Sequence, residues 1–253
     1  MAAQVSLTAL AGLPLFSRDG DLCGEILAAV ARAGLALADG DILVVAQKVV
    51  SKVEGRIASL SQVTPSERAN EIAAEADKDP RLVELILSEA DTVMRVKRGV
   101  IVVRHRLGLV LANAGIDASN VDGTRDSVLL LPVDPDLSCK QLRAHIAEKT
   151  GKNVGVIIND SVGRAWRLGT VGLAIGAAGV PSLWDLRGHI DLFGRALRVS
   201  EEAVADELAG AASLLQGQGN EACPVVLIRG FAADAPTRDA RSLLRPPSED
   251  MFT

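Results

Sequence analysis

The chain has 253 residues, a formal net charge of −5 and 48% hydrophobic residues, which is enough apolar material for one large or two small domains. The acidic balance and the aromatic content of 2% disfavour a nucleic-acid binder, which usually has a basic stripe and stacking platforms for bases. The absence of tyrosine and the three scattered histidines exclude phenolic acid–base chemistry and disfavour a multi-histidine metal site. We therefore expect chemistry based on carboxylates, hydroxyls, lysines and arginines.

The sequence predicts a folded cytoplasmic protein. Its longest apolar runs, at 42–46 and 128–133, are far shorter than the ~20 residues that a membrane-spanning helix needs. Residues 1–17 lack the basic start and long apolar core of a signal peptide. The cysteines, odd in number and far apart, disfavour a disulfide framework or a zinc site, and we expect buried or half-buried thiols at Cys23, Cys139 and Cys223.

The first predicted elements are a helix and a buried strand. Apolar residues at helical spacing predict a helix over 21–33 that ends at Gly34, and the run at 42–45 predicts a strand. Lys48 and Lys52 follow this strand at a spacing of four. They suit a grip on nucleotide phosphate, because lysine acts as a point charge for polyphosphate. The alternative is that both are ordinary solvated charges.

Two helices and then a meander of strands are predicted for the middle of the chain. The helices cover 64–76 and 79–90, and the strands cover 93–96, 100–103 and 107–111. We expect the antiparallel strands to deliver a polar loop at 113–120, which holds two Asn, one Asp and one Ser. A tight Asx-type turn is the alternative, but it would need only one or two such residues.

The later part of the chain alternates strands and helices without a phosphate-loop or dinucleotide-binding motif. The expected elements are a strand at 128–132, a helix at 139–150 ended by Gly151, a Gly/Ala-rich stretch at 169–179, a helix at 200–215 capped by Ser200, a polar glycine loop at 216–221 and a strand at 224–228. The small residues of 169–179 permit close approach of the backbone to a neighbour or a ligand. The residues after Gly230 predict an irregular tail.

The stretch 155–169 carries the densest chemistry. Its apolar run at 156–158 predicts a buried strand that ends at Asn159, Asp160 and Ser161, and such oxygens on a rigid base suit Mg²⁺ or Mn²⁺. Arg164 and Arg167 follow at a spacing of three, so in a turn or helix they would face the same way and suit phosphate. The alternative is that Asp160 caps the following turn and the arginines are surface charges.

A family resemblance extends from about Leu13 to Gly230. The motifs that carry it are Gly12-Leu-Pro-Leu15, Asp39-Gly-Asp41 with Val50-Ser-Lys-Val-Glu-Gly-Arg56, Asn113-Ala-Gly-Ile-Asp-Ala-Ser-Asn120, Leu130-Leu-Pro132 with Asp134-Pro-Asp136, Val156 to Arg167, and Ala205-Asp-Glu207. In this order and spacing, the chain resembles the coenzyme F420:L-glutamate ligase (F420-0:gamma-glutamyl ligase) family. Its members are GTP-dependent enzymes that add γ-linked glutamate to a deazaflavin precursor.

The resemblance implies an α+β fold with mixed, largely antiparallel sheets and flanking helices in two intimately connected subdomains. These would form a single domain over 1–253, with an irregular tail at 232–253. The predicted element order agrees, since meanders and isolated helices mix without a regular βαβ alternation. The resemblance also implies a homodimer with its active site near the subunit contact.

The resemblance further implies two divalent cations, Mg²⁺ or Mn²⁺, with K⁺ as an additional candidate ion. The implied metal ligands are Asp117, Asp160, Ser161 and Gln218, and the implied catalytic residues are Asp117, Asp160 and Arg164. The family often has threonine in place of Ser161 and an acidic residue in place of Gln218. Gln218 keeps an oxygen but lacks the charge, so the second metal should bind more weakly than the first.

The implied GTP-binding positions are Leu13, Pro14, Leu15, Phe16, Gln47, Lys48, Lys52, Asn120, Gln216, Gly217, Gln218, Gly219, Asn220, Glu221, Ala222 and Cys223. The implied reaction passes the γ-phosphoryl group of GTP to a carboxylate, and the glutamate amine attacks the resulting acyl phosphate. Two alternatives stay open: a ligase with the same mechanism and another carboxylate acceptor, and a non-catalytic GTP-binding relative. The presence of both Asp117 and Asp160 favours an enzyme.

Overall fold

The computed structural model describes residues 4–118, 121 and 126–250. The helices are α1 (Leu22–Arg32), α2 (Gln47–Val53), α3 (Glu67–Ala76), α4 (Pro80–Ser88), α5 (Pro135–Thr150) and α6 (Val204–Gln216). The strands are β1 (Ser6–Ala9), β2 (Ile42–Ala46), β3 (Ile57–Ser59), β4 (Ala90–Lys97), β5 (Val100–His105), β6 (Val110–Ala112), β7 (Ser127–Leu129), β8 (Gly155–Arg164), β9 (Arg167–Ala178), β10 (Trp184–Asp185), β11 (Glu201–Glu202) and β12 (Val225–Arg229). This mixture of helices and mostly antiparallel sheets confirms the predicted α+β class. In the described part of the chain, no helix combines the length and apolar character needed to cross a membrane.

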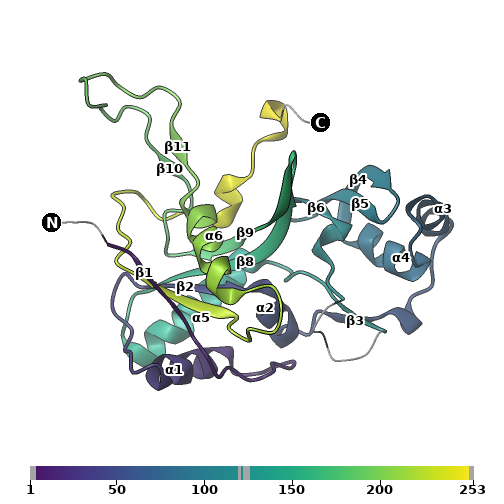
Figure 1. Cartoon of the computed structure of the whole chain (residues 1–253), viewed down its shortest axis with the longest axis horizontal. Coiled ribbons are helices and arrows are strands. Elements are labelled where there is room, and N and C mark those ends of the chain that lie inside the picture. Colours follow the sequence, from purple (N-terminus) through teal and green to yellow (C-terminus); the bar gives the residue numbers. More distant parts are fainter. Residues whose placement is uncertain (1–3, 119–120, 122–125, 251–253) are drawn as a thin grey trace.

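A five-stranded sheet in the order β1-β12-β2-β8-β9 forms the centre of the larger lobe (Figure 1). Its two middle strands, β2 and β8, pair in parallel, with Ile42 opposite Gly155 and Ala46 opposite Asn159. The other neighbours in the sheet pair antiparallel. Because the two strands run in the same direction and Ala46 lies opposite Asn159, the residues that follow Ala46 start beside Asn159 and Asp160.

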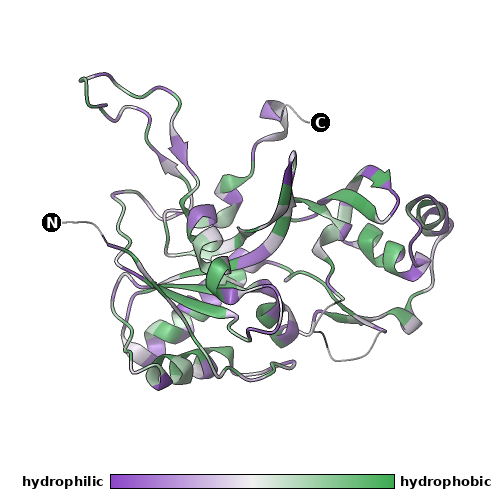
Figure 2. Ribbon diagram, viewed as in Figure 1, coloured by the Kyte–Doolittle hydropathy of each residue, from purple (hydrophilic) through white to green (hydrophobic). Residues whose placement is uncertain are grey.

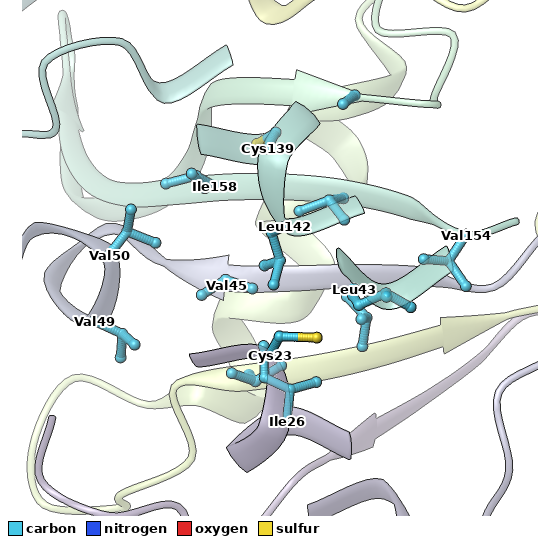
Figure 3. Packing of buried hydrophobic residues seen from close by; sticks show 14 of the residues in the cluster. Cys23, Ile26, Leu43, Val45, Val49, Val50, Cys139, Leu142, Val154 and Ile158 are labelled. Carbon is cyan, nitrogen blue, oxygen red and sulfur yellow. The ribbon is translucent and has the colours of Figure 1, made fainter. Parts of the chain in front are cut away.

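Helices cover both faces of this sheet, which explains why β2 and the first half of β8 are continuous apolar runs. Alternate residues such as Leu43 and Val45 pack against α1 and α5, and Figure 3 shows them beside Cys23 and Cys139 of these helices. The intervening Val44 packs in the second cluster, which α6 completes. Figure 2 shows the resulting band of hydrophobic strands at the centre of the molecule. The sheet is therefore a rigid base for residues at its edges.

A smaller lobe is built from α3, α4 and the meander β4-β5-β6, which lie together on the right of Figure 1. Ser66 and Asp79 cap the two helices through hydrogen bonds to backbone N–H groups, so the helices start at Glu67 and Pro80 and not at the predicted positions 64 and 79. The meander is confirmed, but its last strand starts at Val110 and not at 107. The reason is a tight turn in which Gly108, at φ +84°, donates its N–H to the carbonyl of His105.

Two predicted helix starts are wrong, for different physical reasons. Helix α5 starts at Pro135, four residues before the predicted position, because Asp134 accepts a hydrogen bond from the Leu137 N–H and caps it. Helix α6 starts at Val204, and Ser200 is not its cap. The two glutamates predicted for its first turn, at 201–202, pair with β10 as a short strand instead. Pairing with a strand decided this boundary, which the helical spacing could not reveal.

The predicted close approach of the Gly/Ala-rich stretch is confirmed, and the neighbours are helices. A Cβ on Gly172 would collide with the backbone of Ala209 in α6. A Cβ on Gly176 would lie 2.5 Å from the backbone of Pro135, at the start of α5. Both glycines therefore allow helices to pack directly on β9.

We predict that Gly176→Ala destabilises the protein by about 2 kcal/mol, because overpacking forces the start of α5 away from β9. The measurement is urea unfolding at equilibrium. The control is Gly163→Ala in the same hairpin, since nothing lies within 4 Å of a Cβ built there. Equal stability of Gly176→Ala and the wild type would contradict the packing described for β9.

Candidate active site

A pocket of about 520 Å³ lies where β2 ends beside the middle of β8. Five separate stretches form its wall: the loop before α1, the start of α2, the stretch after β6, the middle of β8, and the loop after α6. The residues that line it are Leu13, Pro14, Leu15, Phe16, Ala46, Gln47, Lys48, Val49, Lys52, Asp117, Asn159, Asp160, Ser161, Gln216, Gly217, Gln218, Gly219, Asn220, Ala222, Cys223 and Pro224. Most of the predicted site residues therefore meet in one cavity.

Helix α2 starts directly after β2, so its first residues lie in the pocket wall. Gln47 is buried, and its side-chain oxygen accepts a hydrogen bond of 2.9 Å from the Ser51 hydroxyl. Lys48 is half-buried, whereas Lys52, one turn further along the helix, is only 8% exposed. Residues four apart share one face of a helix, and both lysines line the cavity. The pocket therefore has a positive side built on α2.

Asp160 and Ser161 lie beside this positive side, on the neighbouring strand β8. The Asp160 carboxylate accepts the Ser161 N–H at 2.8 Å. Desolvation in the pocket raises the pKa of the Asp160 carboxyl to about 6, and the charge of Asp117 adds to this rise. Hydrogen bonds and the charge of Lys48 act in the opposite direction on this pKa. Two carboxylates that repel each other in a desolvated pocket make a site that favours a cation.

Asp117 reaches the pocket from the side of the smaller lobe. Its backbone forms an antiparallel bridge with Leu129, with N–H···O distances of 3.0 and 2.8 Å. Its carboxylate oxygen Oδ2 lies 2.7 Å from the Lys48 ammonium, and each of these side chains is a little under one-third exposed. This ion pair joins the two sides of the pocket.

Arg56 ties the backbone that carries Asp117 to the end of α2. The Arg56 N–H donates to the Ser51 carbonyl at 2.8 Å, and its guanidinium donates to the Leu131 carbonyl at 2.8 Å. The same guanidinium forms an ion pair of 2.8 Å with Glu89, a buried carboxylate at the end of α4. Arg106 binds this carboxylate as well, at 2.9 Å. A single buried carboxylate thus joins the smaller lobe to the segment that follows α2.

The loop after α6 closes the pocket and is anchored by a pair of amides. Asn159 and Gln216 exchange hydrogen bonds of 2.8 and 3.0 Å, and Gln216 also donates to the Pro224 carbonyl at 3.2 Å. The Gln216 amide is thus engaged in holding the loop. Asn159 was predicted as part of the polar run with Asp160 and Ser161, but not as a metal ligand or a GTP contact, and here its amide holds the loop.

Gln218 extends from this loop to the opposite wall. Its side-chain N–H donates to the Ser161 hydroxyl at 2.9 Å, so two of the predicted metal ligands are in contact. Glu221 does not line the pocket. Its carboxylate accepts the Gly219 N–H at 2.8 Å, which supports the shape of the loop.

The prediction that the strand ends before Asp160 is wrong. For this reason the prediction of Arg164 as a site residue is also wrong, because Arg164 lies outside the pocket. Strand β8 continues for ten residues in total and turns back into β9. Arg164 is four positions beyond Asp160, roughly 13 Å along an extended strand. It pairs with Arg167 near the tip of the hairpin, donates to the Leu168 carbonyl at 3.1 Å, and does not line the pocket. Asn120, the remaining predicted nucleotide contact, lies outside the described residues.

The donors suit a hard divalent cation that also binds phosphate. Asp117, Asp160 and Ser161 offer two carboxylates and a hydroxyl at one pocket, and Mg²⁺ is commonly held by one or two carboxylates together with substrate phosphates and water. Among the described residues, no group of three or more His, Cys, Asp and Glu is placed to hold a metal ion. A cation here would therefore need phosphate or water oxygens as well.

Comparison with known proteins relates nearly the whole chain to one family of enzymes. The model of the F420-0:gamma-glutamyl ligase family matches residues 12–230. The coenzyme F420:L-glutamate ligase of Methanothermobacter thermautotrophicus is 45% identical over 98% of both chains. The enzymes of the same name from Archaeoglobus fulgidus and Methanopyrus kandleri are 46% and 45% identical, over 90% and 93% of this chain and 88% and 92% of their own.

Together with these relatives, the fold defines an enzyme of the ligase class. The chain belongs to the F420-0:gamma-glutamyl ligase family, because the family model covers most of its length and the similarity to the relatives extends along nearly the whole chain.

Proposed function

We propose that this enzyme adds L-glutamate to the deazaflavin precursor F420-0, as one or more γ-linked residues, with GTP as the energy source. The single observation that carries the proposal is the convergence of Lys48, Lys52, Asp117 and Asp160 on one pocket. The names of the relatives support the acceptor and the amino acid. The cytoplasmic location stays a prediction from the sequence.

Amide formation from a carboxylate needs an activated acyl group, because a free carboxylate is a poor acyl donor. In the proposed reaction, a carboxylate oxygen of F420-0 attacks the γ-phosphorus of GTP, and GDP leaves. The glutamate amine then attacks the acyl phosphate carbon and loses a proton, and phosphate leaves. The sum is one amide bond, one GDP and one phosphate for each glutamate added.

The pocket residues have distinct parts in this proposal. Lys48 and Lys52 bind phosphate oxygens as point charges, and the backbone of the loop 216–223 surrounds the nucleotide. Asp117, Asp160, Ser161 and Gln218 would hold two divalent cations, Mg²⁺ or Mn²⁺. When bound, such cations neutralise the charge that develops on the phosphates during transfer. K⁺ is a further candidate ion, and activity assays in which K⁺ is replaced by Na⁺ test whether it binds.

The first test is mass spectrometry of the purified protein incubated with GTP, Mn²⁺, glutamate and F420-0. We expect products heavier by one or more glutamate units, with GDP and phosphate released in equal amounts. GTP turnover without a glutamylated product would identify a ligase that acts on another carboxylate. GTP binding without any turnover would identify a non-catalytic relative.

The matched control for this assay is Asp160→Asn, which keeps the shape of the side chain and removes the charge. Turnover should fall by at least about 100-fold, since the stabilisation of transferring phosphate would be lost. The circular dichroism spectrum should not change. Near-normal turnover of the folded variant would remove Asp160 from the proposed mechanism.

Gln218 gives a separate prediction about the second cation. An amide oxygen binds a hard cation more weakly than a carboxylate does, because affinity rises with the charge of the ligands. Activity should therefore depend on Mn²⁺ over two concentration ranges, and Gln218→Glu should shift only the weaker range downward, by roughly tenfold. Initial rates in Mn²⁺ titrations measure this. Superimposable curves for the two proteins would make Gln218 a loop residue without a metal role.

We also propose that the enzyme is a homodimer. A long arm between β10 and β11 projects from the body of the larger lobe (Figure 1), and apolar side chains on this arm face solvent in the single chain. They are Ile190, Leu192, Phe193 and Val199, with 64%, 99%, 81% and 85% exposure. Apolar side chains gathered in this way commonly mark a protein–protein contact, and a second copy of the chain would cover them.

For the dimer, we predict that the double variant Leu192→Asp/Phe193→Asp is monomeric, because two buried charges would have to be desolvated at the contact. Light scattering during size-exclusion chromatography measures the mass in solution. The control is Leu214→Asp, another exposed apolar position, on α6, which should leave the dimer intact. A monomeric wild type, or a dimeric double variant, would overturn the proposal.

A further inference from the structure

The ion pair between Lys48 and Asp117 occupies a carboxylate that the proposed function needs for a metal. The ammonium lies 2.7 Å from Asp117 Oδ2, which is the distance of a full charge-assisted hydrogen bond. An ammonium and a divalent cation repel each other, so both cannot hold this carboxylate equally well at the same time. The contact therefore opposes metal binding at Asp117.

Lys48 has the freedom to move away from Asp117, whereas Lys52, one turn further along α2, is held by burial. Its side chain is 28% exposed and stands in the pocket on a flexible four-carbon stem. Lys52 is 8% exposed and therefore has little freedom to change its direction. Both lysines come from α2, which is fixed between β2 and the bonds of Arg56. A change at Lys48 thus needs side-chain rotation only.

We propose that Lys48 is a placeholder cation: it neutralises Asp117 in the nucleotide-free enzyme and moves to the phosphates when nucleotide and metal enter. This inference rests on the proposed function, since it assigns a metal to Asp117 and phosphate to the pocket. The inference adds that metal binds to Asp117 more readily together with nucleotide than alone. Metal alone has to displace an ammonium, whereas metal that arrives with phosphate offers the ammonium a new partner.

The consequence is a coupling between nucleotide and metal. By linkage, whatever the nucleotide adds to metal affinity, the metal adds equally to nucleotide affinity. Lys48 increases this coupling because it penalises the metal only while the phosphates are absent. The nucleotide-free enzyme would thus bind metal more weakly than the enzyme with nucleotide bound.

The test is Mn²⁺ binding to the nucleotide-free full-length protein, followed by electron paramagnetic resonance or by calorimetry. Lys48→Met removes the ammonium and keeps a flexible side chain of similar length. We expect the Kd for Mn²⁺ to fall roughly fivefold, as is typical for loss of a partly exposed ion pair. The affinity for GDP in the absence of metal should fall in the same variant. A simple phosphate-binding role for Lys48 predicts the second effect without the first.

A double-mutant cycle separates the placeholder from a general effect of charge. In the background of Asp117→Asn there is no ion pair for Lys48 to form at this position, so Lys48→Met should raise the Mn²⁺ affinity by much less than it does in the wild-type background. Only the longer-range effect of Lys48 on Asp160 would remain in the variant. A general effect of charge would persist in full in that background. Lys52→Met, which removes the same charge one turn away, should change the Kd by less than Lys48→Met does.

The outcomes also distinguish this inference from the proposed function. Unchanged Mn²⁺ affinity in a folded Lys48→Met, with normal Mn²⁺ binding in the presence of GDP, would overturn the placeholder and leave the proposed function standing. An absence of Mn²⁺ binding to either protein, even with GDP, would overturn both. Lys48→Gln, measured in parallel with thermal unfolding, ensures that a misfolded Lys48→Met does not decide the result.

Discussion

The parallel pairing of β2 with β8 brings two stretches that are more than 100 residues apart in the chain to one edge of the sheet. Because the strands run in the same direction, α2 leaves the sheet where Asp160 begins to face the pocket. The lysines of α2 and the carboxylate of Asp160 therefore line the same cavity although they are far apart in the sequence. The packing of helices on both faces makes this edge rigid, which is what a site for charged ligands requires.

The second constraint is the buried carboxylate of Glu89. It binds the guanidinium of Arg56 at the end of α2 and that of Arg106 beside β5. Removing one partner of such a buried pair commonly costs several kcal/mol, because the other charge is left uncompensated. Through Leu131 the same network holds the backbone next to the bridge of Asp117 with Leu129. The smaller lobe thus contributes to the pocket through one well-anchored carboxylate.

The pocket holds two carboxylates that repel each other beside two lysines. The carboxylates of Asp117 and Asp160 repel each other, and burial disfavours the charged form of Asp160. Lys48 partly offsets this through its contact with Asp117. A nucleotide with its cations would supply both signs of charge at once, which is the physical reason to connect this geometry with phosphoryl transfer.

The sequence by itself determined much of this protein. Helical spacing located three helices within a few positions, and the structure shows that Asp21, Ser66 and Asp79 cap them through bonds to nearby backbone N–H groups. The apolar runs of β2 and β8 and the polar residues directly after or within them identified Lys48, Lys52, Asp160 and Ser161 as site candidates. These signals are readable because each depends on neighbours in the chain.

Only the tertiary structure decided the rest. The sequence could not reveal that β8 continues to Arg164, because its last residues are held by pairing with β9 and not by burial. That pairing removes Arg164 from the pocket. Asn159 became a site residue through its bonds to Gln216, 57 positions away. The contact of Lys48 with Asp117 likewise joins two lobes, and long-range contacts of this kind leave no periodic trace in a sequence.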